Sequence, residues 1–144
     1  MQLNHDCIRD LLLYLEDHTG IYRDEETRAY TFFEVTSRQL LEDEHLTTEY
    51  SEDEIMYSLL KLKEADMLAA DETSGGANMF RGITVTDITW GGHEFLGNIR
   101  DDTVWNKTKE KAMQLGISSV KGLATLAWKL FLATISNPQL LASV

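Results

Sequence analysis

The chain has 144 residues, of which 43% are hydrophobic, and a formal net charge of −11 at pH 7. This length suits one domain, or one domain with a helical appendage, and the hydrophobic fraction is enough for an ordinary core. One cysteine, Cys7, excludes an intrachain disulfide and favours a reducing compartment. The N-terminus lacks the basic start and apolar run of a signal peptide, so we expect a cytoplasmic protein.

The negative charge is concentrated in the first half of the chain. Residues 1–72 carry 19 Asp/Glu and 6 Lys/Arg, a net charge of −13, whereas residues 73–144 carry 5 and 7, a net charge of +2. Non-specific affinity for DNA comes mainly from cations that displace counterions at phosphates. The charge therefore disfavours simple duplex binding, although acidity also serves solubility alone.

The start of the chain predicts a helix, a loop and a strand. Asn4 is a suitable N-cap, and the helix should bury four apolar residues that recur at helical spacing: Ile8, Leu11, Leu12 and Leu15. Gly20 should end this helix in the left-handed conformation. The polar residues 21–28 predict a loop, and the β-branched and aromatic residues 29–35 predict a short strand.

Two further helices each have two start signals, a capping box and a hydrophobic staple. Thr36 and Gln39 have the spacing of a capping box, and so have Ser51 and Glu54. The buried face of the second of these helices should hold Ile55, Leu59 and Leu62. Its opposite face, which would read a groove if DNA were bound, should hold Asp53, Tyr57, Lys61 and Glu64.

A hairpin should follow this helix. A return strand is expected to start at Met67, Gly75 and Gly76 should lie in a turn spanning residues 71–78, and residues 83–85 alternate as in a half-buried strand. A helix followed by such a hairpin has the order of the recognition helix and wing in the helix-turn-helix class.

Two more helices are predicted next. Thr89 opens the first, which carries three glycines that each weaken a helix by roughly 1 kcal/mol relative to alanine, so packing must hold it. The second, Thr103 to Leu115, is basic and ends at Gly116. Its cations are Lys107, Lys109 and Lys111.

The last predicted helix, Val120 to Ile135 with Ser118 or Ser119 as its cap, is apolar almost all round. It is too short to span a bilayer, and its polar face is too thin for a membrane interface. A helix that is apolar on all sides is normally buried on all sides, so we expect self-association, with the chain's own first helix covering one side. The residues expected at that contact are Leu123, Leu126, Ala127, Leu130 and Phe131.

These elements predict an α+β, mostly α fold. Residues 1–100 should form a winged helix-turn-helix-like core, and residues 101–144 a C-terminal helical extension that mediates self-association.

Three stretches resemble a known family. Residues 3–12 (LNHDCIRDLL), residues 88–101 (ITWGGHEFLGNIRD) and Val104-Trp105 are similar to an uncharacterised family of phages and bacterial prophages, the domain of unknown function 2513. The resemblance covers roughly residues 2–115. It implies a winged-helix-like fold and a mobile-element origin, and it brings no activity, substrate or catalytic residue. Its motif residues with an expected structural role are Trp90, His93, Phe95 and Trp105.

Few residues suggest chemistry. His93-Glu94 could suggest a metal or acid–base pair, but zinc needs three or four ligands, and we interpret His93 as a hydrogen-bonding residue between the wing and the core. Asp101-Asp102 suits a helix N-terminus. Cys7 is expected to be an inert core thiol, although a first-turn position can lower a thiol pKa. We therefore expect no enzyme, no cofactor and no metal.

The preferred functional interpretation is an oligomeric, non-enzymatic adaptor or regulator that binds an unidentified protein, with an acidic surface that imitates DNA toward a basic partner. The alternative is a DNA-binding transcriptional regulator, with duplex DNA disfavoured by charge. Its contacts would come from Arg38, Tyr57, Lys61, Lys63 and Arg81. In a third option, the basic helix around Lys107–Lys111 contacts the phosphates. None of the three options involves a membrane.

Overall fold

The structure, a computed structural model, describes residues 1–136 of the chain. This part is an α+β fold that is mostly helical, as expected from the sequence. In chain order its elements are α1 (His5–His18), β1 (Gly20–Arg23), β2 (Tyr30–Phe33), β3 (Val35–Thr36), α2 (Ser37–Glu42), α3 (Glu44–Glu49), α4 (Glu52–Glu64), β4 (Leu68–Gly76), β5 (Met79–Ile88), α5 (Trp90–Ile99), α6 (Asp102–Leu115) and α7 (Val120–Ser136). The predicted C-terminal extension reaches residue 144, and its residues 137–144 lie outside the described residues.

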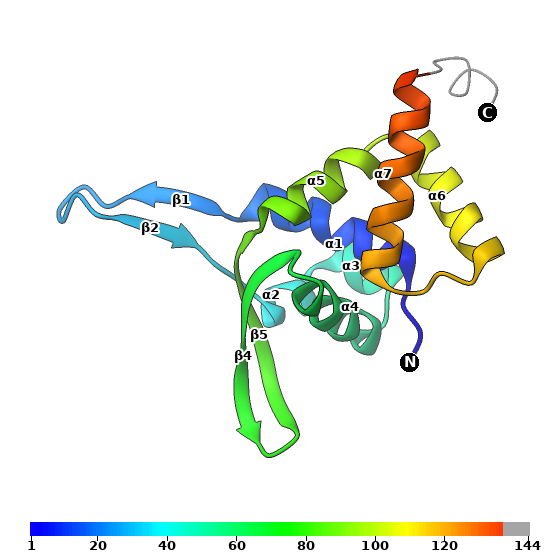
Figure 1. The fold of residues 1–144 in the computed structure, drawn as a ribbon. Helices are drawn as coiled ribbons and strands as arrows, with labels where there is room; N and C mark the ends of the chain where they lie inside the picture. Colours follow the sequence, from blue (N-terminus) through cyan, green and yellow to red (C-terminus); the bar gives the residue numbers. More distant parts are fainter. Residues whose placement is uncertain (137–144) are drawn as a thin grey trace.

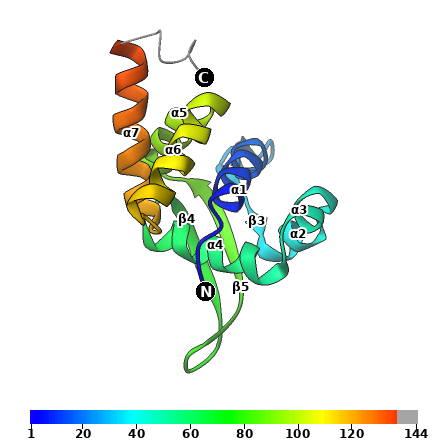
Figure 2. The ribbon, with the colours of Figure 1, turned by 90° about the vertical axis from the view of Figure 1, so that its right-hand side faces the viewer.

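The core is centred on α1. The residues that it buries are Cys7, Ile8, Leu11, Leu12 and Leu15, the face predicted from their spacing. Asn4 caps this helix, since its side chain accepts a hydrogen bond from the backbone N–H of Cys7. Helix α4 adds Ile55, Leu59 and Leu62 to the same core, and α5 adds Phe95, Leu96 and Ile99. Figure 2 shows α1 between α6 and α7 on one side and α2 and α3 on the other.

Capping residues set the helix boundaries between residues 36 and 52. Thr36 and Ser51 each form a complete capping box, with Gln39 and Glu54 respectively, which confirms both predicted starts. The helix that starts after Thr36 ends at Glu42, however, because Asp43 caps a separate short helix, α3. Sequence reasoning missed this break.

The main sheet has three antiparallel strands in the order β3-β5-β4. Strands β4 and β5 form a long hairpin, hereafter the wing, which projects beyond α4 (Figure 1). Most of residues 71–78, predicted as its turn, are in fact strand, and the turn is limited to Ala77 and Asn78. Asn78 has a φ of 60°, a left-handed value that asparagine tolerates better than most residues.

A second hairpin, β1–β2, projects from the body on the side away from α6 (Figure 1). We call residues 20–33 the arm. Its first strand corrects the loop predicted for residues 21–28, because residues 20–23 pair with residues 33–30. Gly20 begins β1 with a φ of 151° and does not take the left-handed helix-ending conformation expected of it. The predicted strand at residues 29–35 is divided between the arm and β3.

The last two helices pack on α5 and on each other. Gly116 ends α6, as predicted, and it has the left-handed conformation. Ser119 accepts a hydrogen bond from the N–H of Gly122 at the start of α7. Helix α7 packs mainly on α5 and α6, which corrects the expected packing on the first helix. The division of the chain into a core of residues 1–100 and a C-terminal extension of residues 101–144 stays a prediction. Within residues 1–136, no helix has the length and apolar character needed to cross a membrane.

Two glycines of α5 provide a matched test of this packing. A Cβ at Gly92 would lie 2.2 Å from the carbonyl oxygen of Met67 and 2.5 Å from Ile88, whereas a Cβ at Gly97 would meet no atom within 4 Å. We expect Gly92→Ala to lower the free energy of unfolding by about 3 kcal/mol through overpacking. Gly97→Ala should raise it by about 1 kcal/mol through helix propensity. Urea denaturation measures both, and equal effects would contradict the packing of α5 on β5.

Candidate functional site

Helix α4 carries the surface that would enter a groove in a helix-turn-helix protein. Tyr57 and Lys61 are half-buried and Glu64 is exposed. The Lys61 ammonium lies 5.2 Å from the centroid of the Tyr57 ring. These residues form one wall of a groove of about 460 Å³, and Ser118 and Lys121 form the other. The connection between α6 and α7 therefore lies along one side of α4.

The cations predicted to contact DNA do not form one basic patch. Lys61 is on the flank of α4 that faces the α6–α7 connection, and Lys63 is on the opposite flank, where it pairs with Glu72 of the wing at 3.3 Å. Lys61 pairs with Glu64 at 2.9 Å. Arg38 on α2 pairs with Glu42 at 3.2 Å, and Arg81 is exposed on β5. Three of these four cations are thus neutralised by a carboxylate.

Carboxylates dominate the surface from the end of α2 to the start of α4. Residues 42–54 contain no Lys or Arg, and we call their carboxylates the acidic surface: Glu42, Asp43, Glu44, Glu49, Glu52, Asp53 and Glu54. Glu54 accepts a hydrogen bond from the Asn4 amide at 2.7 Å and another from the Ser51 backbone at 3.0 Å. These bonds hold the pKa of Glu54 below its usual value, so this carboxylate is ionised at neutral pH.

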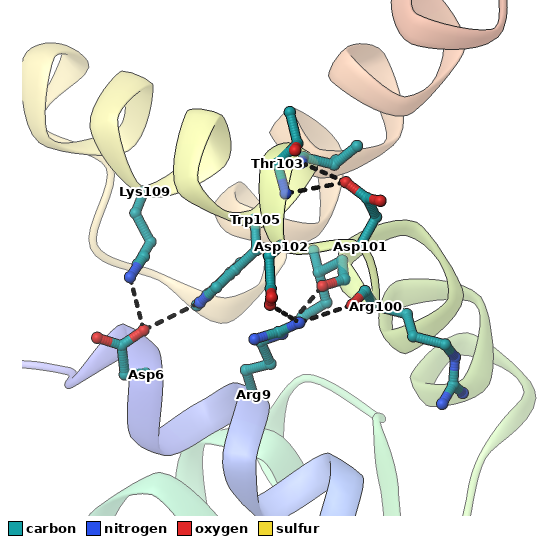
Figure 3. A network of polar contacts seen from close by, with 10 residues as sticks. Asp6, Arg9, Arg100, Asp101, Asp102, Thr103, Trp105 and Lys109 are labelled. Atoms are coloured by element: carbon teal, nitrogen blue, oxygen red, sulfur yellow. Dashed lines mark hydrogen bonds and ion pairs between the residues drawn. The ribbon is translucent and has the colours of Figure 1, made fainter. Parts of the chain in front are cut away.

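A polar network joins α1 to α6 (Figure 3). The Asp6 carboxylate accepts hydrogen bonds from the indole N–H of Trp105 at 2.9 Å and from Lys109 at 2.8 Å. Arg9 donates to the carbonyl oxygen of Ile99 at 3.0 Å and to the Asp102 carboxylate at 2.8 Å. Burial alone would raise the pKa of Asp6, but the bonds from Lys109 and Trp105 outweigh it and lower this pKa.

The other motif residues are divided between the two faces of α5. Phe95 is buried, whereas Trp90 is 80% exposed and its indole N–H donates to Glu94 at 3.0 Å. His93 is exposed as well. The structure therefore corrects the expectation that His93 bridges the wing and the core. Its position places it one helical turn from Trp90, on the outward face.

Helix α7 has one buried face and one exposed face. Leu123, Leu126 and Ala127 are buried in the chain's own core, and Leu130 and Phe131 are half-buried. The surface expected to mediate self-association is therefore partly used within the chain. The exposed apolar residues of α7, which we call the outer stripe, are Trp128, Leu132 and Ile135.

A second groove, of about 590 Å³, lies between α5 and α7. Phe95, Trp128 and Phe131 contribute aromatic side chains to its walls. Gly97 also lines this groove, and the space above its Cα is open. We call it the α5–α7 groove.

Cys7 and Asp101, two of the residues considered for chemistry, both have contacts within the fold. Burial raises the pKa of Cys7 to about 11, so its thiol is protonated at neutral pH and lacks the thiolate that reacts. Asp101 caps α6 by accepting from the N–H groups of Thr103 and Val104. Among residues 1–136, no three His, Cys, Asp or Glu side chains gather where a metal ion could bind.

Comparisons with known proteins give a family and no activity. Residues 2–118 match the model of a family described as "Hypothetical protein (DUF2513)". A protein of Haemophilus influenzae, described as an uncharacterized protein, is 30% identical over 128 residues, which are 86% of this chain and 92% of that protein. No solved structure matches the chain.

The Asp6 network predicts a pH-dependent stability. Because the folded-state pKa of Asp6 is lowered, its contribution is present at neutral pH and is lost as the pH falls below about 4. Asp6→Asn should lower the free energy of unfolding by about 1 kcal/mol at pH 7, since the site is half-exposed.

Urea denaturation of the wild type and Asp6→Asn at pH 7 and pH 3 measures this difference, which should shrink at pH 3. Asp17→Asn, at an exposed position of the same helix, is the control and should change little at either pH. A difference between the wild type and Asp6→Asn that stays constant with pH would contradict the role of the charged carboxylate.

Proposed function

The chain belongs to the DUF2513 family, and we propose that it is a non-enzymatic winged-helix protein that binds a basic protein partner. It acts as an adaptor or regulator, and it self-associates through α7. The observation that carries this proposal is the charge of α4. Its first turn holds Glu52, Asp53 and Glu54, and both of its lysines are paired with carboxylates.

The order of elements supports a winged helix. Leaving the arm aside, α1 is followed by β3, then by α2 and α3, then by α4 and the two strands of the wing. Strand β5 lies between β3 and β4, so the strand before the helix pair joins the sheet of the wing. In this arrangement α4 has the place of the recognition helix.

Electrostatics disfavours DNA at α4. The N-terminal residues of a recognition helix contact base edges, and this end of α4 would bring Glu52 and Asp53 into a groove lined by phosphates. Phosphate contacts by Lys61 or Lys63 would first require each lysine to leave its carboxylate. The α6–α7 connection beside Tyr57 further restricts the approach of a duplex.

The same features suit a positively charged protein. The acidic surface has seven carboxylates between the end of α2 and the first turn of α4, with no Lys or Arg between them. Glu44, Glu49, Glu52 and Asp53 are exposed, and Glu42 is exposed and paired with Arg38. Asp43 and Glu54 are half-buried capping residues. Complementary potentials of this kind steer a partner of opposite charge and increase the rate of association. A surface that would repel DNA can therefore attract a protein whose own binding face is basic. A mobile-element origin and the absence of enzymatic activity stay parts of the proposal.

A DNA-binding transcriptional regulator is the second candidate. The winged-helix order of elements and the exposed Arg81 on the wing favour it. A dimer would then place two copies of α4 about 34 Å apart, one helical turn of DNA. Helix α6 offers less positive charge for phosphate contacts than its sequence suggested, because Lys109 is bound to Asp6.

Binding to duplex DNA separates the two candidates. We expect no change in the fluorescence anisotropy of a labelled random-sequence duplex at 50 mM salt, because α4 presents carboxylates to the phosphates. Tight binding at 50 mM salt that collapses at 200 mM would contradict the proposal. In that case Lys61→Ala should lower the salt slope by about one unit if α4 makes the contact.

Charge reversal tests the partner surface. We expect the triple variant Glu49→Lys, Glu52→Lys and Asp53→Lys to weaken binding of a captured and purified partner at least tenfold. The matched variant Asp17→Lys, Glu34→Lys and Glu110→Lys, with the same net charge, should bind as the wild type does. Titration calorimetry compares the three proteins, and equal losses in both variants would show that net charge alone matters.

A further inference from the structure

The arm exposes large apolar side chains on both of its faces. In the register of β1 and β2, Ile21 lies opposite Phe32, and both share a face with Tyr30. Tyr22 and Phe33 lie on the other face, with ring centroids 4.6 Å apart. These five side chains are between 44% and 66% exposed. An isolated two-stranded hairpin is at best marginally stable in water, so an arm of this composition gains stability when a further surface covers it.

The apolar area of the arm fits what a dimer needs. At about 200 Å² for each large side chain, the exposed fractions of Ile21, Tyr30 and Phe32, which share one face, correspond to roughly 360 Å². If two copies exchange arms, each copy buries this face and a similar area of the surface that receives its partner's arm, on the order of 700 Å² per copy. Stable interfaces of standard size bury about 600–1,000 Å² per partner.

The α5–α7 groove is a receiving surface of the right chemistry. Phe95, Trp128 and Phe131 line it. Because a Cβ at Gly97 would meet no atom within 4 Å, the side chains of a second copy can approach the floor of the groove closely. The outer stripe extends the apolar surface along α7, and Trp90 exposes its indole at the start of α5. The arm does not reach this groove within its own chain, because it projects away from the side where α6 and α7 pack (Figure 1).

Charge selects an arm-to-α7 contact over the two symmetrical alternatives. The turn of the arm contains Asp24, Glu25 and Glu26, all exposed, against one cation, Arg28. Helix α7 contains no carboxylate; its Lys121 lines the groove beside α4, and its Lys129 is exposed next to Trp128. On the α5 wall of the α5–α7 groove, the Glu94 carboxylate accepts a hydrogen bond from the Trp90 indole. Pairing two arms would bring like acidic turns together, and pairing two α7 helices would bring lysines together. An acidic turn beside Lys129 has the favourable sign.

We propose that the arm of one copy docks in the α5–α7 groove of a second copy, with the acidic turn facing Lys129 of α7. This inference rests on the self-association in the proposed function and specifies what α7 contacts. In a twofold dimer each copy gives one arm and receives one, so two equivalent contacts hold the pair.

Two variants that each lose one side of the contact test this arrangement. Phe32→Ser with Phe33→Ser removes apolar side chains from both faces of the exposed arm. Gly97→Phe fills the groove from an exposed position that has open space above it, so the chain should still fold, as circular dichroism can verify. Gly97→Ala is the matched control, because it changes the same residue and leaves the groove open.

Light scattering after size exclusion gives the masses. We expect a dimer for the wild type and Gly97→Ala, and monomers for the arm variant and Gly97→Phe alone. An equimolar mixture of the two monomers should form a heterodimer, because the intact arm of one meets the intact groove of the other. With one contact in place of two, this heterodimer should dissociate at least tenfold more readily than the wild type.

Three outcomes would overturn the inference. A monomeric wild type would overturn it together with self-association, and would leave the acidic surface and its partner unaffected. A dimeric wild type whose two variants remain dimeric would overturn the arm contact alone. If Leu132→Glu with Ile135→Glu then gives a monomer, the helices α7 pair with each other. Monomeric variants that fail to form a heterodimer when mixed would also overturn it.

Discussion

The buried face of α1 is the surface on which the other elements depend. Its five apolar residues, from Cys7 to Leu15, contact the core side of α4 and of α5, and α5 in turn carries α6 and α7. The next face of the same helix is polar, and there Asp6 and Arg9 bind α6. One helix of fourteen residues thus fixes both the place of α4 and the place of the C-terminal helices.

This arrangement has a functional consequence at α4. The α6–α7 connection lies beside Tyr57 and Lys61 because α1 and α5 hold the C-terminal helices close to α4. The wing holds Lys63 from the other side through Glu72. The cations of α4 are therefore engaged within the chain, while Glu52 and Asp53 of its first turn stay exposed. In the proposed function, a scaffold with the element order of a winged helix uses this charge to bind a protein.

Local signals in the sequence predicted the helices well. Asn4, Thr36, Ser51 and Thr89 act as caps where expected, because capping depends on a few neighbouring residues. Long-range pairing was harder to predict. Residues 20–23 form a strand because residues 30–33 pair with them, although their side chains bury almost nothing. The outward position of His93 and the burial of Leu126 likewise depend on where α5 and α7 pack, which periodicity alone does not specify.

In the proposed function, the acidic surface contacts a protein. Hydrogen exchange of the chain with and without its purified partner tests this contact, because the exchange rate of each segment reports how well its backbone amides are protected. We expect slower exchange in α3 and the first turn of α4, within residues 42–54. Protection limited to the wing and the C-terminal half of α4, with residues 42–54 unchanged, would contradict it.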